Sequence, residues 1–205
     1  MLDLGCGSKP YRALFNVDEY IGLDVAVSGH DHFDSRIDVY YDGKNIPFPD
    51  GCFDSVLCSE VFEHVFELSE LLKEINRVTR PGGSLLITLP FIWPEHEVPF
   101  DYARYTSYGI ADLLERSGFA VEAHMKVSNT VETIFQMLAA YVWHTVFPNP
   151  LVIKFLLTPI LVTPLHILGA GLGFLFPKDD TIYQSNVVLC RKVGPPIHIN
   201  RPSVA

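Results

Sequence analysis

Short apolar runs alternate with segments of helical length along much of this 205-residue chain, and this alternation limits its fold more than any other feature. The runs, which are typical of buried strands, are Met1–Leu4, Tyr20–Val25, Ser55–Ser59, Leu85–Leu89, Ala120–Val127 and Asn186–Lys192. Apolar side chains recur every three or four positions over Glu63–Arg80, which predicts one helix that ends at Pro81-Gly82-Gly83. A second, shorter helix is expected over Tyr108–Ser117. Strands joined by helical connections predict an α/β fold with a doubly wound, mostly parallel sheet.

A long apolar stretch at residues 131–176 interrupts this alternation before the last predicted strand. Phe155–Phe176 holds 22 residues without a formal charge, more than the ~18 that indicate a possible membrane span. Asn129 and Glu132 resemble a capping box, so we expect a helix to begin there.

The last strand must return to the same sheet, so the insert is expected to cross a membrane an even number of times or not at all. A helical hairpin that turns at Pro148-Asn149-Pro150, or helices lying in one leaflet, would satisfy this condition. Pro159 and Pro164 are expected to kink the second helix. The alternative is that the segment covers the sheet or forms a dimer interface in a soluble protein. The predicted organisation is a core at 1–130, a hydrophobic helical insert at 131–177, the last strand within 178–193 and a loose tail at 194–205.

The composition and net charge of the chain indicate a globular protein that does not bind nucleic acid. Hydrophobic residues make up 48% of the chain and charged residues 19%, which is typical of a globular domain and not of a disordered segment. The formal net charge is -9, and the 15 Lys and Arg residues are scattered. A phosphate backbone would repel such a chain, so no nucleic-acid partner is expected.

The cysteine and histidine patterns of the sequence do not indicate a metal centre. The four cysteines form no CxxC pair, so free thiols in a reducing compartment are expected. His30-Asp31-His32 looks like a metal-binding tripeptide, but no further ligands follow at a suitable spacing, so a solvated loop is favoured. Met1–Gly5 lack the basic and apolar regions of a signal peptide, and the core is expected to be cytoplasmic.

A glycine turn follows the first apolar run. Leu2–Gly7 reads LDLGCG, and Asp24 ends the next run about 20 residues later. In a doubly wound sheet such a carboxylate reaches the crevice at the strand ends, where it can accept both hydroxyls of a ribose. A dinucleotide site needs a third glycine where this chain has Pro10, which disfavours a nicotinamide-dependent oxidoreductase. Asp3 would suit the amino group of a methionine moiety, and an acidic pocket suits the sulfonium of S-adenosylmethionine (SAM).

The chain resembles the class I SAM-dependent methyltransferases, in particular their broad small-molecule subgroup, with a Rossmann-like sheet. The motifs that carry the resemblance are LDLGCG (2–7), LD (23–24), DGKNIPFPDGCFD (42–54), SEVFEHV (59–65), EINRVTRPGG (74–83) and LLITLP (85–90). They cover roughly residues 1–90 in the family's order and spacing.

The resemblance implies a role for each residue that matches the motifs. Asp3, Gly5 and Gly7 would line the amino-acid end of SAM, with Cys6 among them as a small filler side chain and not a nucleophile. Asp24 would hold the ribose hydroxyls.

The adenine end is assigned in the same way. Asp42 would accept a hydrogen bond from the adenine amino group, and Gly43 would offer its backbone N–H. Asp38 is a rival for the role of Asp42. Ser59, at the end of the fourth strand, would face the methionine moiety.

The reacting methyl group is expected near Glu60 and His64. His64 or His96 would act as a general base for a hydroxyl acceptor. Alternatively, His64 is a hydrogen-bonded helix histidine and Glu60 a first-turn acid of the helix. Substrate contact is predicted for His96, Tyr102 or Arg104, in a loop that resembles segments of saccharide- and lipid-modifying methyltransferases. The alternative is that this loop only supports the fold.

The leading hypothesis is a SAM-dependent methyltransferase that acts at the inner face of a membrane on a small-molecule, saccharide, lipid-linked or quinone-like acceptor. The alternative is a membrane-attached SAM-fold binding or scaffold protein without catalysis. It is motivated by the start of the sequence, which lies inside the segment that matches the family's first strand.

Overall fold

The computed structural model describes residues 1–26, 36–148 and 150–196. The His30-Asp31-His32 tripeptide and most of the tail at 194–205 lie outside these ranges. The described residues form two compact units. The first comprises Met1–Pro90, Pro94–Met125 and the chain from Asn186 onward, and the second comprises Phe91–Trp93 and Lys126–Ser185.

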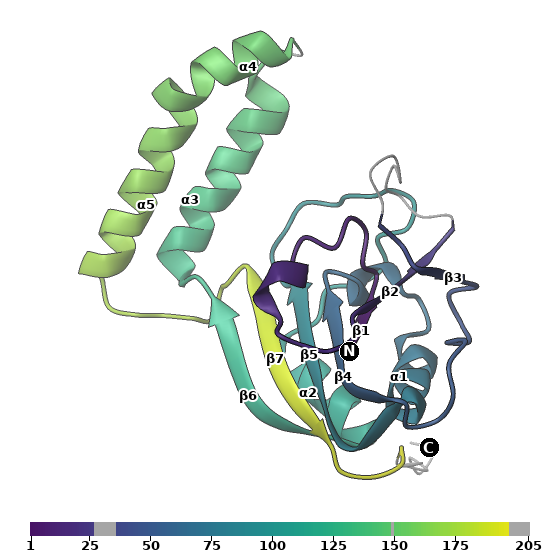
Figure 1. Ribbon diagram of the computed structural model, residues 1–205. Helices are drawn as coiled ribbons and strands as arrows, with labels where there is room; N and C mark the ends of the chain where they lie inside the picture. The colour runs from purple at the N-terminus through teal and green to yellow at the C-terminus, as the bar shows by residue number, and fades with distance from the viewer. Residues whose placement is uncertain (27–35, 149, 197–205) are drawn as a thin grey trace, which may run out of the picture. The chain divides into compact units, whose positions relative to one another are not determined.

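One sheet organises the first unit (Figure 1). Its described strands are β1 (Leu2–Leu4), β2 (Ile21–Val25), β3 (Val39–Tyr41), β4 (Phe53–Ser59), β5 (Thr79–Pro90), β6 (Phe119–Val127) and β7 (Ser185–Lys192). They lie in the order β3-β2-β1-β4-β5-β7-β6. β1 pairs in parallel with both β2 and β4, β2 with β3, and β4 with β5. The predicted α/β, doubly wound and mostly parallel fold is confirmed; β3 is a short strand that the apolar pattern did not reveal.

The core of the first unit lies between this sheet and its helices. Leu2 and Leu4 of β1 are fully buried, as is Leu85 of β5, because central strands of a parallel sheet are covered on both faces. Helix α1 (Leu68–Val78) adds Leu72 and Ile75 to the same cluster, while α2 spans Ser107–Arg116.

The predicted single helix over Glu63–Arg80 is wrong. The chain forms a one-turn 3-10 helix at Phe62–His64, and α1 begins only at Leu68. Val65 is extended between them (φ -112°, ψ 111°), so the helical spacing of the apolar residues continues across a break in the helical backbone. At the other end Thr79 already belongs to β5, which includes Pro81-Gly82-Gly83.

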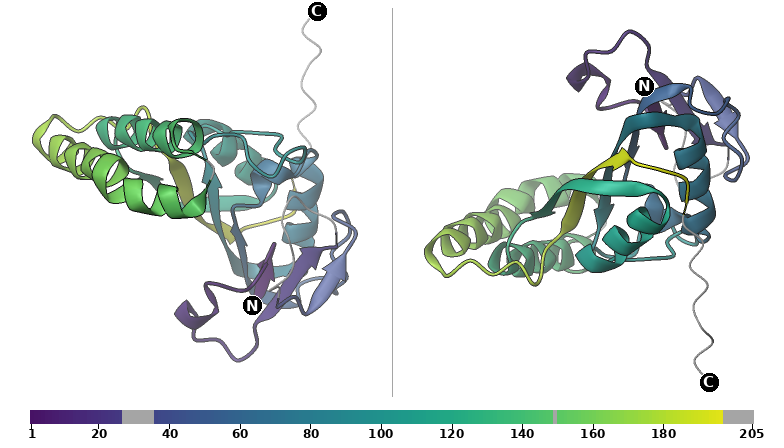
Figure 2. Two further views of the ribbon diagram at one scale, coloured as in Figure 1. Left: turned by 90° about the horizontal axis from the view of Figure 1, so that it is seen from above. Right: turned by 90° about the horizontal axis from the view of Figure 1, so that it is seen from below.

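The second unit is a helical hairpin. Helix α3 (Thr130–Tyr141) begins with the predicted capping box: the Asn129 side chain accepts from the Glu132 N–H, and the Glu132 carboxylate accepts from the Asn129 N–H. The other helical segments are a π turn at Val142–Val146, α4 (Leu151–Leu157), a π turn at Thr158–Val162 and α5 (Thr163–Leu175). Helices α3 and α5 lie side by side in every view (Figures 1 and 2).

The two prolines of the second arm do not break its helical backbone. Pro159 lies in the first turn of the π segment at Thr158–Val162. The wider π turn accommodates the proline ring and the hydrogen bond that proline cannot donate. Pro164 lies in the first turn of α5. The arm changes direction between α4 and α5 (Figure 1), as expected for a helix that contains a proline and a π turn.

Candidate functional site

A cavity of about 1440 Å³ opens in the first unit at the carboxyl ends of β1, β2 and β4. Ligands of doubly wound sheets bind where the strand order reverses, and here that point lies between β1 and β4. Single small-molecule pockets usually measure roughly 300–1,000 Å³, so this one has room for two molecules. The predicted site residues that line it are Asp3, Gly5, Cys6, Gly7, Asp24, Asp42, Gly43, Ser59, Glu60, His64 and Tyr102. His96 and Arg104 do not line it.

The charged residues that line this cavity are mostly acidic. Among the described residues that line it, eight are acidic and two are lysines, Lys44 and Lys73. Carboxylates in a partly enclosed cavity attract cations and repel phosphates, because opposite charges interact more strongly away from bulk water. The cavity therefore suits a positively charged ligand.

The glycine turn after β1 forms the wall nearest the sheet. Gly5 (φ +72°) donates to the Leu23 carbonyl (2.8 Å), and Gly7 (φ +46°) donates to Asp24 Oδ2 (2.9 Å). Positive φ is a conformation that glycine adopts without strain. A side chain at Gly5 would also place its Cβ 2.4 Å from Cγ2 of Val61. The turn thus brings backbone N–H groups and the Asp24 carboxylate to one side of the cavity.

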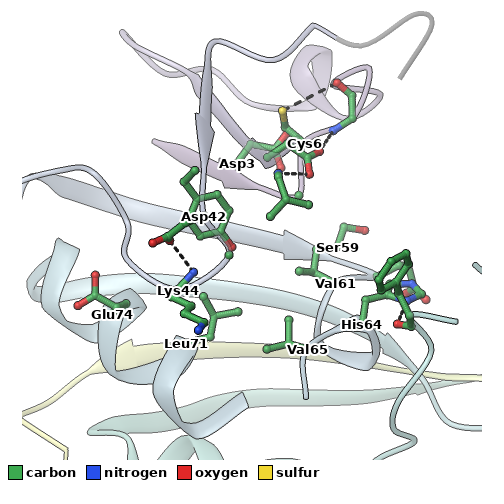
Figure 3. Close-up of a pocket in the computed structure, with 18 of the residues that line it drawn as sticks. Asp3, Cys6, Asp42, Lys44, Ser59, Val61, His64, Val65, Leu71 and Glu74 are labelled. Atoms are coloured by element: carbon green, nitrogen blue, oxygen red, sulfur yellow. Dashed lines mark hydrogen bonds between the residues drawn. The ribbon is translucent and has the colours of Figure 1, made fainter. Parts of the chain in front are cut away.

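Asp3 is a buried acid in β1, 2% exposed. The Tyr20 hydroxyl donates to its Oδ2 (2.5 Å). Burial raises the pKa of the carboxyl group, while the bond from Tyr20 partly counters that rise. Cys6 lies close by (Figure 3), and burial raises the pKa of its thiol to about 12. The thiol is therefore protonated at neutral pH, consistent with a filler side chain.

Asp42 and its rival Asp38 have different surroundings. Asp42 follows β3 and accepts from the backbone N–H groups of Asn45 (2.7 Å) and Lys44 (2.8 Å), which lower its pKa to about 2. It lines the cavity on the side away from His64 (Figure 3). Asp38 does not line the cavity; it accepts from the Gly22 N–H (2.7 Å) and contacts Lys9.

Glu60 follows β4 with a positive φ of +53°, a strained conformation for a residue with a side chain. Its N–H donates to the Thr88 carbonyl (2.9 Å), which fixes the turn beside Ser59. The alternative role of Glu60 as a first-turn acid does not apply, because α1 begins only at Leu68.

His64 and His96 converge on Glu63, a residue that the sequence motifs did not single out. Their rings lie 4.9 Å apart, and Nε2 of each faces Oε1 of Glu63, at 3.7 Å and 3.9 Å. Glu63 is 1% exposed, neither carboxylate oxygen has a hydrogen-bond partner, and burial raises its pKa to about 8. Glu63 was missed because it lies within SEVFEHV at a position assigned to a helix.

Of the two predicted substrate residues that follow His96, Tyr102 lines the cavity and Arg104 does not. Tyr102 lines the cavity, and its ring meets Phe66 edge-on at 5.6 Å. Arg104 instead holds Asp101 through two hydrogen bonds (2.5 and 2.7 Å), which lower the pKa of Asp101 to about 2. The guanidinium of Arg104 is therefore engaged with this carboxylate and is not presented to the cavity.

The comparisons with known proteins agree with this geometry. Residues 2–87 match a family model described as a methyltransferase domain. A probable SAM-dependent methyltransferase of Mycolicibacterium smegmatis is 30% identical over 135 residues, 60% of this chain and 52% of the relative. Residues 2–87 therefore form a methyltransferase domain, and the relatives support a class I SAM-dependent methyltransferase. The resemblance seen in the sequence is thereby confirmed, and the family implies SAM as the cofactor.

Further relatives of this methyltransferase domain match shorter segments. The ubiquinone/menaquinone biosynthesis C-methyltransferase UbiE of Shewanella oneidensis is 38% identical over 60 residues, 29% of this chain and 24% of the relative. The chain spans about half the length of the M. smegmatis relative and less of the UbiE protein.

Solved structures share the fold of the methyltransferase domain. A SAM-dependent methyltransferase from Mesorhizobium loti has a TM-score of 0.54 at 16% identity and covers 93% of this chain and 89% of its own. The cyclase SpnF has a TM-score of 0.57 at 17% identity, covering 96% and 74%. These likenesses concern the fold alone, since proteins of one fold carry different activities.

Proposed function

We propose that this protein binds SAM in the cavity at the ends of β1, β2 and β4 and transfers its methyl group to a small-molecule acceptor. The observation that carries the proposal is the placement of Asp3, Asp24 and Asp42 along one acidic cavity, after or within three neighbouring strands. SAM carries a positive amino group, a positive sulfonium and a ribose diol, and carboxylates are suited to all three.

The proposed roles follow the chain. Asp24, already oriented by the Gly7 N–H, accepts from the ribose hydroxyls through its remaining lone pairs. Asp42 contacts the adenine, and Asp3 lies toward the amino-acid end. The volume left beyond SAM, bounded by His64, Phe100 and Tyr102, receives the acceptor. Alignment of the acceptor with the methyl carbon supplies much of the acceleration.

His64 is proposed as the group nearest the acceptor. Its Nδ1 lies 3.0 Å from the Phe100 carbonyl oxygen, which can only accept, so Nδ1 carries the proton and Nε2 has a free lone pair. His96 contacts the His64 ring from outside the cavity, and Glu60 lines the cavity at the turn after β4. Both are proposed to position the groups around the acceptor. The UbiE relatives favour a quinone-type acceptor, and saccharide or lipid-linked acceptors fit the same volume.

Calorimetric titration with S-adenosylhomocysteine tests cofactor binding. We expect Asp24→Asn to weaken binding by about 1.5–3 kcal/mol, the value of a hydrogen bond to a charged group. Asp112→Asn is the matched control, because Asp112 is exposed and pairs with Arg116 on α2. Absence of binding to the unaltered protein would refute the proposal.

We further propose that the hairpin of the second unit attaches the protein to the cytoplasmic face of a membrane. In the described part of the chain, the 25-residue helix Leu151–Leu175 is long and apolar enough to cross a membrane, and only 6% of its most apolar window is buried. Exposed apolar side chains of this size are seldom left in water.

The distribution of charge along the hairpin indicates how it meets the lipid. Lys154, near the turn, is the single Asp, Glu, Lys or Arg between residues 133 and 176, and its ammonium lies 5.5 Å from the Trp143 ring centroid. The opposite end carries Asp179 and Asp180, bonded to Thr130 and Lys126. The turn therefore enters the lipid first, while the charged end stays in water.

Flotation with anionic phospholipid vesicles tests the attachment. Leu151, Phe155 and Leu156 are 77%, 81% and 65% exposed, so their triple substitution by Asn removes apolar surface without opening the hairpin. We expect the bound fraction to fall at least tenfold. The matched control substitutes the exposed Leu14 and Tyr108 of the first unit by Asn. Equal flotation of both variants would contradict the proposal.

A further inference from the structure

Two histidines and one carboxyl group meet beside the cavity, and a single histidine near the acceptor does not explain why both imidazoles face Glu63. One ligand atom from each of Glu63, His64 and His96 can be chosen so that all three lie within 4.8 Å of one another. Glu63 comes from the 3-10 turn after β4, as does His64, whereas His96 comes from the loop after β5. Segments that are far apart in the sequence thus bring these three side chains together.

The carboxyl group of Glu63, at the centre of this cluster, has no hydrogen-bond partner. Both oxygens of Glu63 and Nε2 of His64 are buried without a hydrogen-bond partner. Buried polar atoms are nearly always paired, so these three unpaired atoms lack the partner that their burial requires. Arg104, which is close enough to lower the pKa of Glu63, forms an ion pair with Asp101 instead. A cation between Glu63 and the imidazoles would satisfy these atoms together.

Both imidazoles present the nitrogen that a cation requires. Nδ1 of His64 donates to the Phe100 carbonyl (3.0 Å), which leaves the lone pair on Nε2. Nδ1 of His96 lies 3.3 Å from the Pro94 carbonyl oxygen and 3.4 Å from Asp101 Oδ2, while Arg104 Nη2 is farther, at 3.5 Å. The two oxygen acceptors favour a proton on Nδ1. Metal-bound histidines characteristically donate their second nitrogen to a carbonyl or carboxylate in this way.

We propose that Glu63, His64 and His96 bind one divalent transition-metal ion. Two imidazoles and a carboxylate favour zinc, cobalt, iron or manganese over magnesium or calcium, which prefer oxygen ligands. Metal–ligand bonds of about 2.0–2.2 Å place neighbouring ligand atoms roughly 3.3 Å apart, so the observed 3.7 and 3.9 Å need only a small contraction.

The site has one more ligand group and one open side. Glu97 Oε1 lies 3.6 Å from His64 Nε2 and is placed to serve as a fourth ligand. His64 and Glu97 line the cavity, whereas His96 does not, so the ion would face the cavity from that side. The proposal requires no SAM and departs from the sequence-based expectation that no metal is bound.

Metal binding is tested on the full chain after removal of adventitious ions with a chelator. We expect calorimetry to give one Zn²⁺ per chain, and Co²⁺ to give a visible d–d absorption. His64→Gln and His96→Gln should each weaken Zn²⁺ binding at least 100-fold, and Glu63→Gln at least tenfold. Mg²⁺ should bind at least 100-fold more weakly than Zn²⁺.

Two controls locate the ion. His166→Gln removes an exposed histidine of the second unit, and a His30→Gln/His32→Gln variant removes the histidines of the tripeptide; neither should change the affinity. Circular dichroism verifies that each variant is folded, and His96, 30% exposed, tolerates substitution best. Loss of binding in the tripeptide variant, equal binding of Mg²⁺ and Zn²⁺, or unchanged binding in His96→Gln would overturn the proposal.

Discussion

Two glycines of one turn should respond very differently to the same substitution. Gly5 and Gly7 both have positive φ, and an added Cβ at Gly7 would meet nothing within 4 Å. At Gly5 it would lie 2.4 Å from Cγ2 of Val61, well inside the usual 3.5–4.0 Å contact of two carbons. The pair therefore separates backbone strain from steric overlap.

The expected magnitudes follow from these contacts. Gly7→Ala should lower the unfolding free energy by about 1–2 kcal/mol, because alanine must adopt a left-handed backbone conformation there and meets no other atom. Gly5→Ala incurs the same strain and must also displace Val61, which is half-buried against the core, at a further cost of about 1–3 kcal/mol. Since Val61 lines the cavity, the displacement should also weaken S-adenosylhomocysteine binding.

Urea denaturation of the ligand-free protein measures this difference. Val61→Ala removes the methyl group that clashes, so the double variant Gly5→Ala/Val61→Ala should recover about 1–3 kcal/mol relative to additivity, while Gly7→Ala/Val61→Ala should be additive. Equal destabilisation by Gly5→Ala and Gly7→Ala, or additivity in both pairs, would refute the packing argument.

Three further predictions concern other groups of the first unit. Arg77→Lys should lower the unfolding free energy by about 1–2 kcal/mol in urea denaturation, because the guanidinium donates to both Glu74 oxygens and to two carbonyls that lysine cannot span. Asp42 has a folded-state pKa of about 2, below its unfolded value, so it contributes stability above pH ~4 that is lost as the pH falls toward 2. Acid denaturation of Asp42→Asn should therefore be less steep there. Cys52 is exposed and Cys6 is buried with a pKa of about 12, so Cys52→Ser should remove most of the fast thiol labelling at pH 8, and fast labelling that persists would contradict this.

The sequence predicted the sheet well because buried parallel strands are continuous apolar runs. β3 was not predicted, because Val39–Tyr41 is short and its residues alternate between half-buried and exposed positions. The helix over Glu63–Arg80 was drawn too long because an extended residue, Val65, keeps its apolar side chain in register with the helical pattern. Periodicity reports which side chains are buried, but it does not reveal where the backbone leaves the helix.

The site could be predicted in part for the same reason. Residues in the glycine turn and at the strand ends are local in sequence, and the cavity collects them. The cluster of Glu63, His64 and His96 was not predictable from the sequence. It forms only because the loop after β5 folds back and brings His96 Nε2 to 3.9 Å from Glu63 Oε1. Likewise, nothing local to Arg104 indicates that Asp101 holds its guanidinium.

The most direct test of the central claim is conversion of SAM to S-adenosylhomocysteine, followed with methyl-labelled SAM, bacterial lipid extract and the full chain, with and without added Zn²⁺. We expect label in the organic phase with the unaltered protein and with Asp112→Asn, and at least tenfold less label with Asp24→Asn. S-adenosylhomocysteine binding without any methyl transfer, under either metal condition, would contradict the methyltransferase proposal and favour a binding protein built on the same fold.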